Sequence, residues 1–91
     1  MSETKFLSLP DNLIVDVPGE ALSQMSSLET LDIGWCRLTK ILQTDFKALP
    51  RLQFLLLAGN NISMIEQASF PLGLIHLHLG HNKIQNLNGS I

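Results

Sequence analysis

The residues best suited to chemistry are three histidines near the C-terminal end of the chain. His76, His78 and His81 are the only histidines of the sequence. If this segment is a strand, His76 and His78 face the same way, because alternate side chains of a strand share one side. The cluster allows three interpretations: ligands of a zinc ion, a contact on the binding face that switches with pH at about pH 6, or ordinary polar residues on an exposed surface. We favour the last and expect no metal and no cofactor.

The other reactive side chains form no catalytic arrangement. No nucleophile stands beside a suitable base, no glycine-rich phosphate loop is present, and the acidic residues are dispersed. Asp11 and Asp32 do not form a pair of the kind used in acid–base catalysis. Cys36 is the only cysteine, so the chain has no internal disulfide. We therefore expect a protein that is not an enzyme.

Length, composition and charge narrow the class further. The chain has 91 residues, of which 45% are hydrophobic and 15% charged, with a net charge of −2. These values predict one domain with extensive burial. The six basic residues are scattered, which argues against a nucleic-acid partner. The longest apolar run, 54–58, is far too short for a transmembrane segment.

The strongest pattern in the sequence is a set of apolar columns that repeat every 24 residues. Leu7, Leu31 and Leu55 form one column, and other columns keep the same spacing. Periodicity of this length is typical of units that bury their apolar side only by stacking on copies of themselves. The other columns are Leu9, Ile33 and Leu57; Ile14, Leu38 and Ile62; Val17, Ile41 and Ile65; and Leu22, Phe46 and Phe70.

Written on this period, the chain resembles the leucine-rich repeat family. The family pattern is L-x-x-L-x-L-x-x-N/C-x-L. Four segments match it over about residues 4–87: TKFLSLPDNLI, LETLDIGWCRL, LQFLLLAGNNI and LIHLHLGHNKI. The 24-residue spacing, with Phe46 and Phe70 as core residues, is similar to the typical subclass found in extracellular receptors.

The resemblance implies an α/β-type solenoid, a segment of a leucine-rich repeat horseshoe. Parallel strands would line its concave face, with loops and short helical turns on its convex face. We divide the single segment 1–91 into units of about 4–27, 28–51, 52–73 and 74–91, the third shortened by two residues. The last unit is incomplete and neither end has a cap. We therefore expect a fragment of a longer array, or self-association through the uncapped ends.

The column between the apolar ones is polar and predicts a structural ladder. Its side chains stand where each unit turns away from its strand, and amides there can bond to backbone groups that would otherwise be buried without a partner. We interpret the cysteine of this column as a structural member, not as a reactive thiol. The ladder residues are Asn12, Cys36, Asn60 and Asn82.

The residues that the register turns outward are candidates for partner contacts. Trp35, Phe54 and Leu56 are large and apolar although no packing within the repeat demands it. Exposed apolar patches commonly mark interaction sites, although single exposed apolar residues are also normal. We predict a protein partner on the concave face, touching Phe6, Asp32, Trp35, Phe54, Leu56, His76, His78 and His81.

The resemblance favours non-catalytic protein recognition in an extracellular receptor, adhesion or immune protein. Toll-like receptors and insect adhesion and immune proteins are examples of the subclass. Asn61 and Asn88 lie in N-glycosylation acceptor patterns, which agrees weakly with an extracellular or cell-surface location. The N-terminal MSETKFLSLP lacks the apolar stretch of a signal peptide. The alternative is therefore a cytoplasmic scaffold or regulatory protein with the same repeats.

Overall fold

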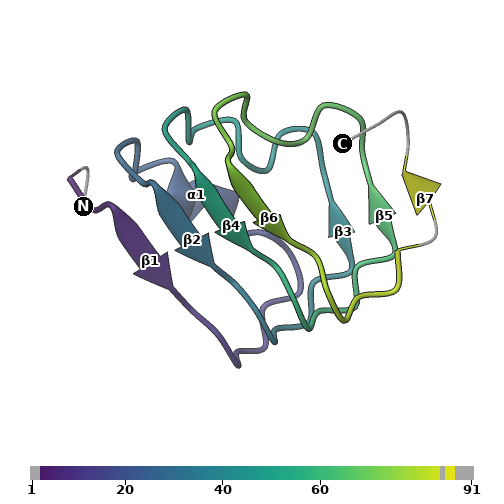
Figure 1. The fold of residues 1–91 in the computed structure, drawn as a ribbon. Helices are drawn as coiled ribbons and strands as arrows, with labels where there is room; N and C mark the ends of the chain where they lie inside the picture. The colour runs from purple at the N-terminus through teal and green to yellow at the C-terminus, as the bar shows by residue number, and fades with distance from the viewer. Residues whose placement is uncertain (1–2, 85, 88–91) are drawn as a thin grey trace.

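The chain winds through two parallel β-sheets, shown in a computed structural model (Figure 1). The structure describes residues 3–84 and the strand at 86–87. The larger sheet has the order β1-β2-β4-β6. Its strands are β1 (Phe6–Ser8), β2 (Thr30–Asp32), β4 (Phe54–Leu56) and β6 (His76–His78). All neighbours pair in parallel, which confirms the parallel strands predicted from the repeat.

The register of the larger sheet follows the apolar columns. Leu7 lies opposite Leu31, Leu31 opposite Leu55, and Leu55 opposite Leu77. The first two steps span 24 residues and the last one 22. The short third unit therefore keeps its strand in register, and the missing residues come from the connection behind the sheet.

A second sheet, which the sequence did not predict, lies on the other side of the coil (Figure 1). It has the order β3-β5-β7, formed by β3 (Lys40–Ile41), β5 (Met64–Ile65) and β7 (Asn86–Leu87). Each of these strands has only two residues. The alternation that reveals a strand needs at least four residues, so such short strands cannot be recognised from sequence.

The connections behind the larger sheet are turns and one short helix, as expected. Helix α1 (Gly19–Leu22) follows Pro18 and buries Leu22 against the core. In the second unit the chain makes successive turns instead, with the N–H groups of Asp45 and Leu49 donating to carbonyls three residues earlier. No helix in the described part of the chain is long and apolar enough to cross a membrane.

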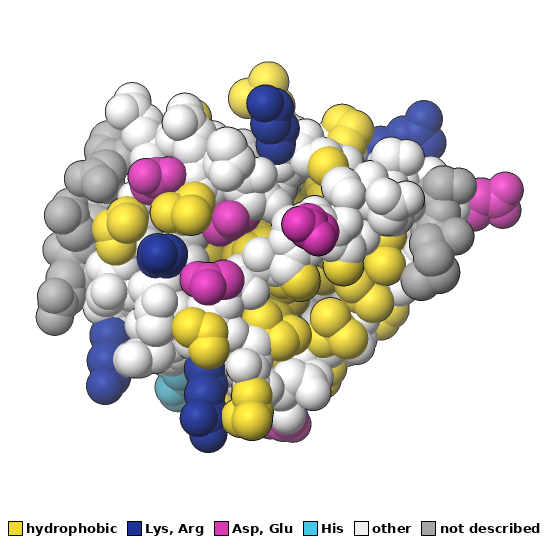
Figure 2. All heavy atoms as spheres, turned by 180° about the vertical axis from the view of Figure 1, so that it is seen from behind, with side chains coloured by type: hydrophobic (Ala, Val, Ile, Leu, Met, Phe, Trp, Pro, Cys, Tyr) yellow, Lys and Arg dark blue, Asp and Glu magenta, His cyan; other side chains and the backbone are white. Residues whose placement is uncertain are grey.

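The core lies between the two sheets and is complete only in the middle of the stack. Leu31 and Leu55 are 0% exposed, whereas Leu7 and Leu77 of the same column are half-buried. The outer units have only one neighbouring unit to pack against. Hydrophobic side chains accordingly gather on the side of the molecule where the N-terminal unit lies (Figure 2). Exposed side chains of that unit include Phe6, Leu13 and Val15.

Candidate functional site

The outer face of the larger sheet carries two rows of side chains, in the register predicted from the sequence. The first row is Phe6, Thr30, Phe54 and His76, and the second is Ser8, Asp32, Leu56 and His78. Phe6 is 62% exposed, while Phe54 and Leu56 in the middle of the face are half-buried. The outward side chains of β4 are therefore apolar, whereas β2 carries Asp32, the one acid in the two rows.

Aromatic rings continue across the C-terminal half of this face. The rings of Phe54 and His76 stack with their centroids 5.0 Å apart and an interplanar angle of 12°. His76 and His78 share one side of β6, as expected, with centroids 6.5 Å apart. His81 follows the end of β6 and contacts the ring of Trp35 instead. The three histidines therefore do not form a single cluster.

The described residues give no support to a metal site. No group of three or more His, Cys, Asp or Glu side chains in this part of the chain could hold a metal ion. The histidines contribute instead to an aromatic and polar surface on the sheet and its edge.

Two asparagines of the ladder column bond to the backbone of neighbouring units. Asn60 accepts from Leu38 N at 3.1 Å and donates to Ile33 O and Leu57 O, both at 2.9 Å. Asn82 repeats the pattern one unit later, accepting from Ile62 N at 3.1 Å. The amides thus tie neighbouring units together.

The two remaining ladder residues make fewer contacts. Cys36 is buried, and its thiol donates to Leu9 O of the preceding unit at 3.3 Å. Asn12 is exposed and bonds only within its own unit, to Leu9 O and Pro10 O. Cys36 therefore contacts the preceding unit from a buried position, with a weaker donor than an amide.

The residue before each ladder position has a left-handed backbone. This second column comprises Asp11, Trp35, Gly59 and His81, with φ values of 57°, 55°, 76° and 56°. Such values suit glycine and are unusual for a large side chain. A bulky residue held there costs about 1–3 kcal/mol. Trp35 therefore occupies a backbone conformation that disfavours a large side chain.

The structure corrects one expectation about Trp35, which we treated as lacking an intramolecular contact. Its indole ring lies over Gly59 of the next unit, so closely that a Cβ atom on Gly59 would overlap the ring. The ring also contacts His81 two units away, with centroids 5.6 Å apart. Trp35 nevertheless remains 56% exposed. The sequence could not show this contact because it depends on the direction of the side chain.

Asp32 ends its strand beside the turn that carries Trp35. Its Oδ1 accepts from Gly34 N at 2.9 Å, and its Oδ2 lies 3.5 Å from the hydroxyl of Ser8. A Cβ atom built on Gly34 would lie 3.1 Å from Asp32 Oδ1 and 3.3 Å from Ala58 O. The carboxylate therefore sits close to the main chains of the turns that carry Trp35 and Gly59.

Of the two glycosylation candidates, only Asn61 can be placed. Its side chain is exposed and its backbone N–H donates to Leu38 O at 2.9 Å. Ser63, the hydroxyl residue of the acceptor pattern, is exposed as well. Asn88 lies outside the described residues.

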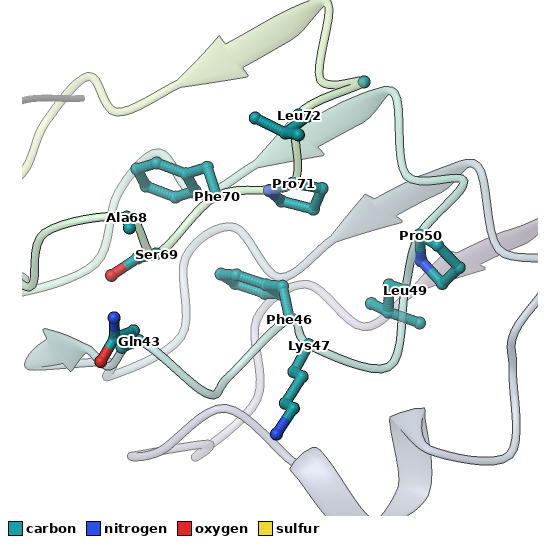
Figure 3. Close-up of a pocket in the computed structure, with 11 residues that line it drawn as sticks. Gln43, Phe46, Lys47, Leu49, Pro50, Ala68, Ser69, Phe70, Pro71 and Leu72 are labelled. Carbon is teal, nitrogen blue, oxygen red and sulfur yellow. The ribbon is translucent and has the colours of Figure 1, made fainter.

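A pocket of about 370 Å³ lies behind the larger sheet, between the second and third units. The rings of Phe46 and Phe70 stack at its centre, 6.1 Å apart, whereas the side chain of Lys47 points away from them (Figure 3). Phe46 is buried in the core, as expected, and Phe70 is half-buried. One feature of the sequence bears on this pocket: the shortened segment that contains Pro71 and Gly73 forms part of its lining.

Asp45, in the turn behind the second unit, is predicted to make stability depend on pH. Burial raises the pKa of its carboxyl above the usual 3.8; the bond from Leu42 N lowers it, and the negative charges of Asp16 and Glu66 raise it. A raised pKa disfavours the charged form in the folded state. This contribution to stability is therefore fully present below pH 3.8 and is lost as pH rises through the raised pKa.

Asp45→Asn should remove this dependence while its amide oxygen still accepts from Leu42 N. Urea unfolding at a series of pH values should show the wild type losing stability relative to the variant as pH rises from below 3.8. Glu20→Gln, at an exposed position on α1, is the control. Identical pH profiles for Asp45→Asn and the wild type would contradict the assignment.

Comparison with known proteins agrees with the repeat geometry. The leucine-rich repeat family model matches residues 2–62, and the chain belongs to this family. Opticin of Bos taurus is 40% identical over 83 residues, which cover 89% of this chain and 24% of opticin. Human Podocan-like protein 1 is 35% identical over 86 residues, covering 92% of this chain and 17% of that protein.

A third relative combines such repeats with other domains. Human Leucine-rich repeats and immunoglobulin-like domains protein 1 is 36% identical over 84 residues, covering 89% of this chain and 8% of the relative. The chain thus spans about a quarter or less of the length of each of these proteins. No solved structure matches the chain significantly. Membership of the family makes protein binding its general role.

Proposed function

We propose that this chain is a segment of a 24-residue-type leucine-rich repeat horseshoe that binds a protein partner through its larger sheet. That sheet is the concave face of the proposed horseshoe. The observation that carries the proposal is the apolar centre of its outer face, where Phe54 and Leu56 stand side by side on the outward side of β4. A few well-packed side chains near the centre of an interface supply most of its binding energy.

We further propose that the segment is non-catalytic and works outside the cell. The resemblance to the subclass of extracellular receptors supports this location, as does a relative whose name joins leucine-rich repeats to immunoglobulin-like domains. The exposed Asn61 is compatible with a glycan. The half-buried leucines of the outer units, Leu7 and Leu77, are the surfaces through which further units or a second copy would pack.

The binding face can be tested with peptides selected from a random phage-displayed library on the immobilised protein. Leu56→Ser should weaken the selected binders by about tenfold or more, because truncating one of the few dominant residues at the centre of an interface costs about 2 kcal/mol or more. The circular dichroism spectrum should stay unchanged, since Leu56 points away from the core.

The matched control is Leu72→Ser, at a fully exposed leucine behind the sheet. Binders should keep their affinity for this variant. A set of binders that responds to Leu72→Ser and ignores Leu56→Ser would overturn the proposed face.

A further inference from the structure

Trp35 is more than half exposed beside the larger sheet, and its position restricts two residues of the chain. Its backbone is left-handed, which a bulky residue rarely adopts. Its neighbour in the next unit must be Gly59, because any side chain there would overlap the indole. A hydrophobic ring that only filled space would not need to leave more than half of its surface in solvent. The same left-handed turn occurs in all four units, and Trp35 is its only large apolar side chain.

The indole contacts Gly59 and His81, and two acidic residues are bonded to Gly34, the residue before Trp35. Asp32 places its carboxylate at the main chains of the turns that carry Trp35 and Gly59. Asp11 occupies the position of Trp35 one unit earlier, and its backbone N–H donates to Gly34 O, beside Trp35. The two rows on the outer face of the sheet contain no lysine or arginine. The surface therefore combines an exposed aromatic face with negative charge.

We propose that Trp35, Asp32 and Asp11 bind an arginine side chain of the protein partner; this inference rests on the proposed function. A planar guanidinium stacks on an indole face and donates from a fork of five N–H groups to carboxylates. Asp32 Oδ2 is the acceptor best placed for it, because Oδ1 already accepts from Gly34 N at 2.9 Å, whereas Oδ2 accepts only a long bond of 3.5 Å from the Ser8 hydroxyl. An ammonium group lacks the plane needed to stack and to bond at once, so arginine should be preferred over lysine.

The single tryptophan of the chain makes a direct test simple, because its fluorescence reports only on Trp35. The probe is the blocked tripeptide Gly-Arg-Gly, compared with the same peptide carrying citrulline, which has the same shape and no charge. The arginine peptide should change the emission in a saturable way and bind about tenfold more tightly than the citrulline peptide, equivalent to about 1.4 kcal/mol.

Variants assign the contact to the named residues. Asp32→Asn should weaken the arginine peptide about tenfold, while its amide oxygen can still accept from Gly34 N. Glu20→Gln, which removes one negative charge from an exposed position of α1, should leave binding unchanged. Equal affinity for the two peptides, no change in emission, or full binding by Asp32→Asn would each overturn the proposal.

The peptide library separates this proposal from the function on which it rests. Binders that are enriched in arginine and lose affinity for both the Leu56→Ser and the Asp32→Asn variant support the binding face and the arginine site. Binders that respond to Leu56→Ser but lack arginine and ignore Asp32→Asn leave the binding face standing and overturn the arginine site. Binders that ignore Leu56→Ser overturn the proposed face.

Discussion

Replacing Asn60 by leucine should lower the free energy of unfolding by about 3 kcal/mol or more. The substitution would leave Leu38 N and Ile33 O buried without their amide partners. Each unsatisfied buried backbone group costs about 1–3 kcal/mol. Leu57 O is less affected, because Asn82 also donates to it at 2.9 Å. Urea unfolding followed by circular dichroism measures the loss.

The same change at Asn12 is the matched control. This side chain is exposed and bonds only within its own unit, so water can replace its contacts. We expect a loss of less than about 1 kcal/mol. Equal losses at the two positions would show that the amide bonds between units do not account for the ladder.

The opposite substitution in the same column should stabilise the protein. Cys36→Asn would keep a donor for Leu9 O and would bring an amide oxygen to the position from which Asn60 and Asn82 accept a backbone N–H. By the register, the corresponding donor in the first unit is Ile14 N. One added hydrogen bond stabilises by about 1 kcal/mol. Urea unfolding measures the gain, and an unchanged or lowered urea midpoint would contradict this interpretation of the column.

Gly59→Ala should destabilise the fold by about 2–4 kcal/mol and displace the indole of Trp35. The new methyl group would overlap the ring, and the backbone at φ 76° disfavours any residue with a Cβ atom. Forced overlap in a packed contact costs about 1–3 kcal/mol, and the left-handed backbone adds about 1 kcal/mol. Urea unfolding and the tryptophan emission maximum report the two effects separately.

A second background separates the overlap from the backbone. In a Trp35→Asn protein, whose asparagine tolerates the left-handed backbone, Gly59→Ala should cost only the backbone part, about 1 kcal/mol. Gly34→Ala is not a suitable control, because a Cβ there is crowded by Asp32 Oδ1 and Ala58 O. The same cost in both backgrounds would mean that the indole does not rest on Gly59.

Much of the candidate site was open to sequence reasoning because it depends on register. A residue such as Leu56 faces outward as soon as Leu55 is assigned to the core, since neighbouring strand residues point to opposite sides. The same step placed His76 and His78 on one side of β6. The repeat pattern placed Asn60 at the turn that follows β4, where its amide bonds to the backbone of the preceding unit.

Contacts that cross units through irregular backbone were beyond that reasoning. Trp35 has a left-handed backbone, and its ring contacts Gly59 and His81. No sequence pattern predicts a left-handed backbone at a tryptophan. The desolvation of Asp45 behind the sheet likewise depends on how neighbouring turns close over it.

The sequence by itself determined the family, the parallel strands of the larger sheet and the inward or outward direction of their residues, since all three follow from a spacing that must hold for the leucines to stack. Only the tertiary structure decided the second sheet, the pocket behind Phe46 and Phe70, and the position of the Trp35 ring. These features depend on side-chain direction and on turns of two or three residues. The contacts that stabilise them come from residues one or two units away and not from the local sequence.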